Sequence, residues 1–310
     1  MKKKILLTED FDPVLFAGLS ALGYECDQRN GISHNDVLKI IQQYYGIIVA
    51  TRIEVDKEMI DQTRQLKFIA RAGSGMENIE VDYAVSRHIS CINSPEGNAD
   101  SVGEHAAGLL LALFHNIARS FLQTRNSEWL VEENRVHELE GKTIAIIGYG
   151  NTGRSLARKL SSFNMTVLAY DKYLNNYGDS FARESTMDQI YHEAEIISFH
   201  LPLTAETSGM INEQYLQRFS NPLHLINTSR GKIIQHRQLL EAIENGRITS
   251  AGLDVYENEN FAMHNKEHRD VFFALNQTGK VIFTPHIAGK SFESKKKIAE
   301  ILIQKISMLT

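Results

Sequence analysis

The sequence has 310 residues, of which 43% are hydrophobic and 23% charged, with a formal net charge of −5. This composition is typical of a globular chain of one or two domains, and the acidic balance offers no basic field for nucleic acid. The first apolar run ends at Thr8, Glu9 and Asp10, too soon for a signal peptide, and no run approaches membrane-spanning length, so no membrane partner is expected. Two cysteines, Cys26 and Cys91, favour free thiols in a reducing cytoplasm.

The first third of the chain alternates strand-like and helix-like patterns, which predicts a parallel α/β sheet. Asp12 and Pro13 fit the N-cap and first residue of a helix. The expected strands cover residues 4–7, 47–50, 68–71 and 89–92, with helical patterns between them.

A long apolar helix follows, and Ser101 and Glu104 have the spacing of a capping box at its start. Because this helix is more apolar than a surface helix needs, we expect it to lie at a domain boundary or a subunit interface. The polar segment 125–140, with Trp129, predicts an arm, and a plain surface helix is the alternative. We therefore expect a homodimer through the region 100–140.

Residues 142–171 carry the most informative pattern in the chain. A β-branched run is followed by Gly148, Gly150 and Gly153, then by apolar residues at helical spacing, and a second apolar run ends in Asp171. This order predicts a dinucleotide site, in which the glycines allow a tight turn, close approach of a pyrophosphate and close helix packing. Asp171 would accept hydrogen bonds from ribose hydroxyls and repel a 2′-phosphate, which favours NAD over NADP, although Lys172 follows directly.

The rest of the chain continues the alternation. Further strands are expected at 195–200, 223–227, 248–253 and 281–283, and helices at 212–219, 238–243 and 291–308. The polar stretch 257–270 predicts a flexible loop. His264 and His268 have an i, i+4 spacing without an HExxH pattern, so no metal site is predicted.

Polar groups follow several of the predicted strands, where open α/β sheets bind ligands. Gly73, Ser74 and Gly75 could present backbone N–H groups to an anion, or form only a turn. Arg230 could clamp a carboxylate, or form only a surface ion pair. His286, between a proline and a glycine turn, is a candidate for proton transfer.

The ordered motifs resemble those of the D-isomer-specific 2-hydroxyacid dehydrogenases, and most closely the 3-phosphoglycerate dehydrogenases. The resemblance covers essentially the whole chain. It rests on residues 71–73, 101–105, 148–153, 200–204, 227–231, 252–255 and 284–286.

That resemblance implies two doubly wound parallel-sheet domains, with the active site between them: a flavodoxin-like substrate domain of residues 1–98 and 289–310, and an inserted Rossmann NAD domain of residues 99–288. It implies NAD as cofactor and a small 2-hydroxy or 2-oxo acid as partner. Besides the glycines and Asp171, the implied cofactor contacts are Asn151, Thr152, His200, Leu201, Pro202, Thr207, Thr228, Ser229, Asp254, Ala288 and Gly289.

The family also implies a catalytic arginine, glutamate and histidine. Arg230 and His286 match by motif. Glu257 and Glu259 are both candidates for the glutamate, and the family spacing of five residues after the aspartate selects Glu259. Asn260 replaces the proline that usually follows, which puts the shape of the loop in question.

The leading expected substrate is 3-phosphoglycerate, which would place the enzyme in serine biosynthesis. The alternatives are glyoxylate or hydroxypyruvate reduction, and an NAD-sensing role like that of related corepressors. Phosphoglycerate dehydrogenases carry an Arg-Ser pair after the second strand of the first domain, where this chain has Ala50-Thr51 followed by Arg52. Arg52, Arg71 and Arg135 are candidates for a phosphate contact, or solvated surface charges; Arg52 with Gly73, Ser74 and Gly75 forms the expected substrate set.

Overall fold

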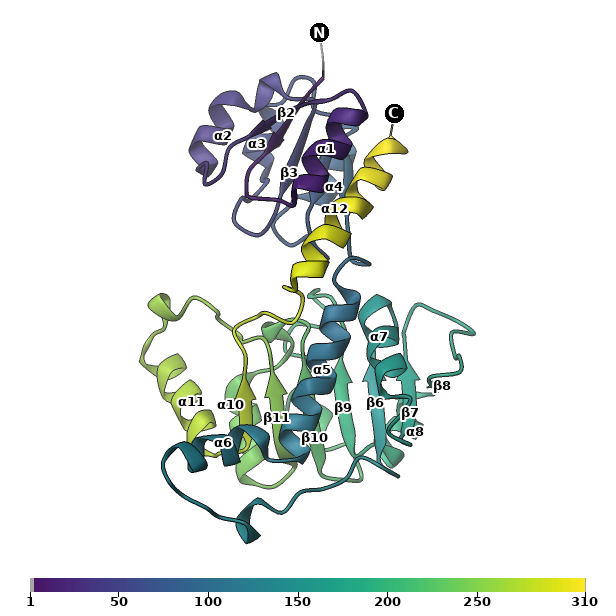
Figure 1. The fold of residues 1–310 in the computed structure, drawn as a ribbon, viewed down its shortest axis with the longest axis vertical. Helices are drawn as coiled ribbons and strands as arrows, with labels where there is room; N and C mark the ends of the chain where they lie inside the picture. Colours follow the sequence, from purple (N-terminus) through teal and green to yellow (C-terminus); the bar gives the residue numbers. More distant parts are fainter. Residues whose placement is uncertain (1–2, 310) are drawn as a thin grey trace. The chain divides into compact units, whose positions relative to one another are not determined.

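The computed structural model describes residues 3–309. The chain divides into two compact units, unit 1 of Met1–Ala99 with Lys290–Thr310, and unit 2 of Asp100–Gly289. Each contains a parallel sheet with helices on both faces (Figure 1), so the predicted fold class is confirmed.

The sheet of unit 1 has the strand order β2-β1-β3-β4-β5, the flavodoxin-like order. Its central strand β3 reads GIIV and is buried at every position, as a strand covered on both faces must be. The strands are β1 (Lys4–Leu7), β2 (Glu25–Gln28), β3 (Gly46–Val49), β4 (Phe68–Arg71) and β5 (Ser90–Asn93).

The helices of unit 1 bury apolar side chains against both faces of this sheet. The Asp12 side chain accepts from the Val14 N–H at 3.0 Å, so the predicted N-cap is confirmed. Leu15 and Leu302 meet in one core cluster, where the first and last helices of the chain lie side by side (Figure 1). The helices are α1 (Pro13–Ala21), α2 (His34–Ile40), the 3₁₀ turn η1 (Ile41–Gln43), α3 (Lys57–Asp61), α4 (Val81–Ser86) and α12 (Phe292–Ser307).

The sheet of unit 2 has the order β12-β11-β10-β9-β6-β7-β8. Order reverses between β6 and β9, which is the topological switch point of a Rossmann sheet and the place where such sheets bind dinucleotides. The strands are β6 (Thr143–Ile147), β7 (Thr166–Tyr170), β8 (Arg183–Glu184), β9 (Ile196–Phe199), β10 (Leu223–Asn227), β11 (Ile248–Leu253) and β12 (Val281–Phe283).

One helix, α5, lies along one face of this sheet (Figure 1) and packs Leu109 and Leu110 against Ile144 and Ile226. The opposite face buries Leu239 and other residues of α8, α10 and α11. The helices are α5 (Ala99–Phe114), α6 (Ile117–Arg125), α7 (Asn151–Leu160), α8 (Met187–Glu193), α9 (Glu213–Leu216), α10 (His236–Glu244) and α11 (Lys266–Gln277), with 3₁₀ turns η2 (Glu132–Asn134), η3 (Gly231–Ile233) and η4 (Phe261–Met263).

Two expectations about secondary structure were wrong, and one strand was not predicted. Helix α5 begins at Ala99, so Ser101 lies inside it and does not form a capping box; its hydroxyl donates instead to the Ala288 carbonyl at 2.5 Å. Strand β2 was not predicted because it is a polar edge strand. The stretch 257–270, expected to be a flexible loop, contains η4 and the start of α11, which Asn265 caps through the His268 N–H.

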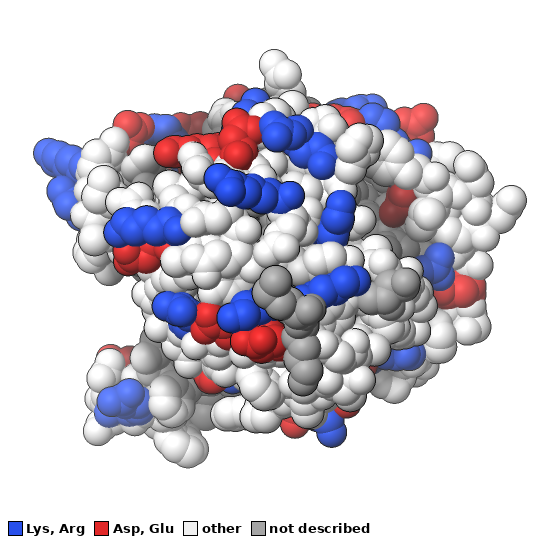
Figure 2. Space-filling view, turned by 90° about the horizontal axis from the view of Figure 1, so that it is seen from above, with Lys and Arg blue, Asp and Glu red and all other residues white. Residues whose placement is uncertain are grey.

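The face shown in Figure 2 has no large area of a single charge. Basic and acidic side chains lie next to one another there, between wide uncharged areas. Cys26 and Cys91 are free thiols. Among residues 3–309, no helix combines the length and the apolar character needed to cross a membrane.

Candidate active site

Most of the predicted site residues lie in unit 2, just beyond the carboxyl ends of its strands. Because all strands of this sheet are parallel, these ends meet at one edge. The residues follow β6 (Gly148), β7 (Asp171), β9 (His200), β10 (Thr228, Ser229, Arg230), β11 (Asp254) and β12 (His286).

The glycine loop after β6 needs its three glycines for different reasons. Gly148 has φ +92°, and a Cβ there would lie 2.4 Å from the His200 carbonyl oxygen. A Cβ on Gly153 would lie 2.2 Å from the Gly148 carbonyl oxygen, so this glycine allows α7 to pack closely on β6. A Cβ on Gly150 would meet no heavy atom within 4 Å, so the space there is open at the N-terminus of α7, where Asn151 and Thr152 begin the helix. This loop fits the pyrophosphate of a dinucleotide.

Asp171 ties the end of β7 to the glycine loop. One carboxylate oxygen accepts from the Tyr149 N–H at 2.9 Å, and the other accepts from the N–H groups of Tyr173 and Leu174 at 3.0 and 3.2 Å. Lys172, which could have attracted a 2′-phosphate, forms an ion pair with Glu206. The carboxylate therefore sits where it can meet a ribose, and the neighbouring lysine charge is compensated.

His200 links β9 to the same loop. Its Nδ1 lies 3.1 Å from the Thr152 hydroxyl and its Nε2 lies 2.9 Å from the Ser198 hydroxyl. Burial lowers the pKa of His200 to about 4, so the ring is neutral at physiological pH. Thr207 closes the following loop by donating to the Pro202 carbonyl at 2.7 Å, and the Leu201 side chain lies against Gly148.

Hydrogen bonds of the Asn227 side chain stabilise the turn after β10. The Asn227 side-chain oxygen accepts from the Ser229 N–H and hydroxyl at 3.0 and 2.7 Å, and its NH₂ group donates to the Arg230 carbonyl at 3.0 Å. The buried Thr228 hydroxyl has no hydrogen-bond partner within the described residues. A buried hydroxyl of this kind normally finds a partner, so its oxygen is available to a bound polar ligand.

Asp254 organises the chain after β12. Its Oδ1 accepts from the Thr284 hydroxyl at 2.6 Å and the Ile287 N–H at 3.0 Å, and its Oδ2 accepts from the Ala288 N–H at 2.8 Å. His105 of α5 adds its Nε2 at 2.8 Å from the Thr284 hydroxyl. Only 1% of Asp254 is exposed. This buried carboxylate fixes the 284–289 segment, which carries His286 at φ +54° and ends at Gly289.

The three predicted catalytic side chains come together within unit 2. His286 Nδ1 lies 2.7 Å from Glu259 Oε2, and both side chains are partly exposed, at 40% and 44%. Partial burial alone would raise the pKa of Glu259, but the hydrogen bond to His286 and the charges of His286 and Arg230 outweigh it and lower that pKa. The guanidinium group of Arg230 is oriented by its own turn, since its Nη1 donates to the Ser229 carbonyl at 2.8 Å.

The alternative glutamate has a different partner. Glu257 Oε2 accepts from the His236 N–H at 3.3 Å and lies 3.5 Å from Nδ1 of the buried His236 ring. Gly231 lets the Arg230 turn approach this loop, because a Cβ there would lie 1.9 Å from the Tyr256 carbonyl oxygen. The structure thus places Glu259 beside His286, and Glu257 at the base of the loop that carries Glu259.

The anion-binding segment expected in unit 1 is only partly available. The Gly73 N–H donates to the Arg71 carbonyl at 2.9 Å and to the Ser94 hydroxyl at 3.0 Å. The N–H groups of Ser74 and Gly75 have no acceptor within residues 3–309. Because the Gly73 N–H is already engaged, an anion at this segment would bind to the N–H groups of Ser74 and Gly75.

Two long-range contacts, one in each unit, were missed from the sequence. His105 lies 179 residues from Thr284, and no local pattern joins them. Glu9 accepts from the Ala50 N–H in unit 1, across 41 residues. The tertiary fold alone brings these partners together.

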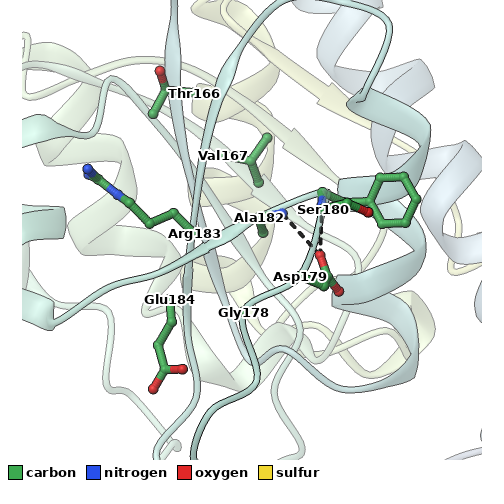
Figure 3. Close-up of a pocket in the computed structure, with 9 residues that line it drawn as sticks. Thr166, Val167, Gly178, Asp179, Ser180, Ala182, Arg183 and Glu184 are labelled. Carbon is green, nitrogen blue, oxygen red and sulfur yellow. Dashed lines mark hydrogen bonds between the residues drawn. The ribbon is translucent and has the colours of Figure 1, made fainter.

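A hollow lies elsewhere in unit 2 (Figure 3). It has a volume of about 640 Å³, lies beside the edge strand β8, and is lined by Thr166, Val167 and residues 178–184. Asp179 inside it accepts from the N–H groups of Phe181 and Ala182 at 2.8 and 3.1 Å (Figure 3). It also accepts from the Tyr149 hydroxyl and pairs with Arg154, both at 2.9 Å, so its carboxylate ties this loop to the start of α7. None of the predicted site residues lines this hollow, so we do not assign it to the active site.

No group of three or more His, Cys, Asp or Glu side chains in the described part of the chain is arranged to hold a metal ion. The open space at Gly150, the carboxylate at the end of β7 and the unpartnered Thr228 hydroxyl together fit a dinucleotide.

Comparison with known proteins gives consistent matches. Residues 107–288 match the NAD-binding domain of the D-isomer-specific 2-hydroxyacid dehydrogenases. Hydroxypyruvate reductase of Thermotoga maritima is 32% identical over 275 residues, which are 89% of this chain and 88% of that protein. D-3-phosphoglycerate dehydrogenase of Archaeoglobus fulgidus is 30% identical over 305 residues, which are 98% of this chain and 56% of that protein.

The chain thus spans about half the length of the phosphoglycerate dehydrogenases it matches. Among solved structures, D-lactate dehydrogenase of Aquifex aeolicus, complexed with NAD and lactic acid, matches with a TM-score of 0.83 and 25% identity, covering 97% of this chain and 94% of that one.

Proposed function

Because the chain belongs to the D-isomer-specific 2-hydroxyacid dehydrogenase family, with NAD as the cofactor, we propose that it interconverts a D-2-hydroxy acid and its 2-oxo acid. The observation that carries this proposal is the contact of 2.7 Å between His286 and Glu259, with the Arg230 charge close enough to lower the Glu259 pKa. An arginine, a histidine and a carboxylate are the groups needed to hold an acid and to transfer one proton.

Bound NADH supplies the hydride that reaches C2 of the oxo acid. Arg230 binds the substrate carboxylate with two parallel hydrogen bonds and polarises the C2 oxygen. Protonated His286 donates its proton from Nε2 to that oxygen, since its Nδ1 is engaged by Glu259. Glu259 holds the ring in this orientation through its contact with Nδ1. In the oxidation direction, neutral His286 accepts the proton of the hydroxyl.

We propose that Ser74 and Gly75 of unit 1 offer backbone N–H groups to an anionic group of the substrate, because both N–H groups lack acceptors in residues 3–309. On the cofactor side, Asp171 binds the ribose hydroxyls, which favours NAD over NADP. The pairing of Lys172 with Glu206 supports that preference, since it compensates the positive charge that directly follows Asp171.

The identity of the acid is the finer part of the proposal. The sequence predicts 3-phosphoglycerate, with hydroxypyruvate and glyoxylate as alternatives, and the relatives include both D-3-phosphoglycerate dehydrogenases and hydroxypyruvate and glyoxylate reductases. The test is an NADH-oxidation screen against phosphohydroxypyruvate, hydroxypyruvate, glyoxylate and pyruvate. Turnover of at least one acid supports the proposal, whereas NADH binding without turnover of any acid would favour an NAD-sensing role.

We also propose a cytoplasmic homodimer formed through the region 100–140. Support comes from exposed apolar side chains in and after α6, including Phe121, Leu122 and Trp129, at 58%, 58% and 83% exposure. Apolar groups gathered in this way on a surface commonly mark an interface. Sedimentation of Trp129→Glu beside the wild type tests this, and a dimer that persists in the variant would contradict it.

A further inference from the structure

Tyr149 stands between Gly148 and Gly150, in the glycine loop that fits the pyrophosphate of the cofactor. Its side chain is completely buried, at 0% exposure. The ring belongs to the same core cluster as Leu156 of α7 and Ala182. Because the glycines on either side have no side chain, the Tyr149 side chain is what anchors this part of the loop to the core.

Two carboxylates hold Tyr149, one through its backbone and one through its side chain. Its N–H donates to Asp171 Oδ2 at 2.9 Å, and its hydroxyl donates to Asp179 Oδ1 at 2.9 Å. The guanidinium group of Arg154 lies 4.6 Å from the centre of the Tyr149 ring, and its Nη1 donates to Asp179 Oδ2 at 2.9 Å. The residue therefore joins the glycine loop to the end of β7 and to the segment 172–184 that follows β7.

Asp179 is a strong acceptor for the Tyr149 hydroxyl. Its carboxylate is also held by the N–H groups of Phe181 and Ala182, at 2.8 and 3.1 Å, so its position does not depend on Tyr149 alone. Burial by itself would raise the pKa of Asp179, but the hydrogen bonds from these two N–H groups and from the Tyr149 hydroxyl outweigh it and lower that pKa. Hydrogen bonds to an ionised acceptor are stronger than those between neutral groups.

Tyr177 holds the segment 172–184 against β7. Its hydroxyl accepts from the Asp171 N–H at 2.9 Å and donates to the Ala169 carbonyl at 3.2 Å. The ring centroids of Tyr177 and Tyr149 are 5.9 Å apart, a separation typical of favourable aromatic pairs. The segment is thus bonded to β7, and Tyr149 is the residue through which it supports the glycine loop.

We propose, on the basis of the proposed binding of NAD at this loop, that Tyr149 and Asp179 are positioning residues that hold the glycine loop ready for the pyrophosphate. The fully buried Tyr149 side chain acts without touching the cofactor. When the bond between its hydroxyl and Asp179 is lost, the loop adopts the binding conformation for a smaller fraction of the time. The apparent Kd for the cofactor rises in inverse proportion to that fraction. Turnover of bound cofactor is unaffected, because Arg230, Glu259 and His286 follow other strands.

The test is Tyr149→Phe, which keeps the buried ring and removes only the hydroxyl. Fluorescence titration should give a Kd for NADH about tenfold above that of the wild type, while kcat at saturating NADH stays within about twofold. ADP-ribose, which has the pyrophosphate but no nicotinamide, should lose affinity by the same factor of about ten in calorimetric titration.

The matched control is Tyr191→Phe, which removes a hydroxyl from α8, near the amino end of β9 and therefore at the opposite edge of the sheet from the glycine loop. Its Kd for NADH should stay within about twofold of the wild-type value. Asp179→Ala shows whether Tyr149 acts through Asp179. The double variant Tyr149→Phe/Asp179→Ala should bind NADH as Asp179→Ala does, within about twofold, because the shared bond can be lost only once.

The outcomes separate this inference from the proposed function. A Kd in Tyr149→Phe equal to that of the control, or a loss of kcat with an unchanged Kd, overturns the positioning role and leaves the proposed function intact. Additive losses in the double variant overturn the action through Asp179. A wild type that does not bind NADH overturns the proposed function, and the inference with it.

Hydrogen exchange provides a further test that does not depend on the folding of Asp179→Ala. In the protein without cofactor, the peptide covering 147–156 should exchange at least about threefold faster in Tyr149→Phe than in Tyr191→Phe, since the loop opens more often. Equal exchange in the two variants would overturn the positioning role of the Tyr149 hydroxyl.

Discussion

The carboxylate of Asp254 offers a prediction whose size follows from its contacts. Asp254→Asn preserves shape but leaves one acceptor oxygen where the carboxylate has two. The native oxygens accept from the Thr284 hydroxyl, the Ile287 N–H and the Ala288 N–H. If the amide oxygen faces Thr284 and Ile287, its NH₂ group must face the Ala288 N–H, and two buried donors oppose each other.

The cost is the loss of one hydrogen bond to a charged group, about 1.5–3 kcal/mol, with further cost for the opposed donors. A total of about 3 kcal/mol corresponds to roughly a hundredfold shift in the equilibrium for local opening of the segment 284–289. Turnover should also fall, because this segment carries His286.

Hydrogen exchange read by mass spectrometry on the peptide covering 281–289 measures this opening directly. The matched control is Asp270→Asn, which neutralises an exposed carboxylate on α11 of the same unit. Exchange about a hundredfold faster in Asp254→Asn, and unchanged in the control, is the expected result. Exchange within about threefold of the control would refute the assignment of Asp254 as the anchor of this segment.

Three further predictions address the cofactor, the proton and the dependence on pH. His286→Ala should lower kcat by about 10²–10⁴-fold in steady-state kinetics. The Kd for NADH, measured by fluorescence titration, should stay within about twofold of the wild-type value. An unchanged kcat would show that His286 does not transfer the proton. Asp171→Ala should reduce the preference for NADH over NADPH in kcat/KM about tenfold, and a constant preference would show that Asp171 does not meet the ribose. Because burial lowers the pKa of His200 from 6.5 to about 4, the unfolded chain binds the proton first and stability is lost as pH falls from about 6.5 towards about 4. Urea titrations at about pH 7 and about pH 5 measure the unfolding free energy of each protein. Between these two pH values the wild type should lose about 2 kcal/mol more unfolding free energy than His200→Gln; equal losses would contradict a buried neutral ring.

The sequence predicted most reliably those parts that are fixed by backbone geometry. The glycines at 148 and 153 face carbonyl oxygens within 2.4 Å of where a Cβ would be, so only glycine is compatible with that packing, and the pattern is visible in one short stretch. The central strands were also predicted, because burial on both faces requires uninterrupted apolar runs such as GIIV.

The elements that were missed have weak local signals. Strand β2 reads ECDQ and lies at a sheet edge, where polar residues are tolerated. Helix α11 buries only Val271 and Leu275, which is too little apolar surface to produce a clear helical period. Ser101 and Glu104 have the spacing of a capping box, yet the helix had already begun at Ala99.

Contacts between segments that lie far apart in the chain could not be predicted from the sequence. The family spacing selected Glu259, but only the fold places Glu259 against His286 and Glu257 against His236. Likewise, the candidate phosphate arginines could be identified by type, while their actual acceptors, such as the Thr8 carbonyl for Arg52, depend on how three loops of unit 1 meet.

The central claim is that a hydride passes from the nicotinamide to C2 of a 2-oxo acid while His286 protonates the oxygen. The most direct measurement supplies NADH with deuterium in both C4 positions of the nicotinamide, with hydroxypyruvate as acceptor, and analyses the product by chiral chromatography and mass spectrometry. The account predicts a D-2-hydroxy acid with deuterium at C2. A product without deuterium at C2, or one of L configuration, would contradict it.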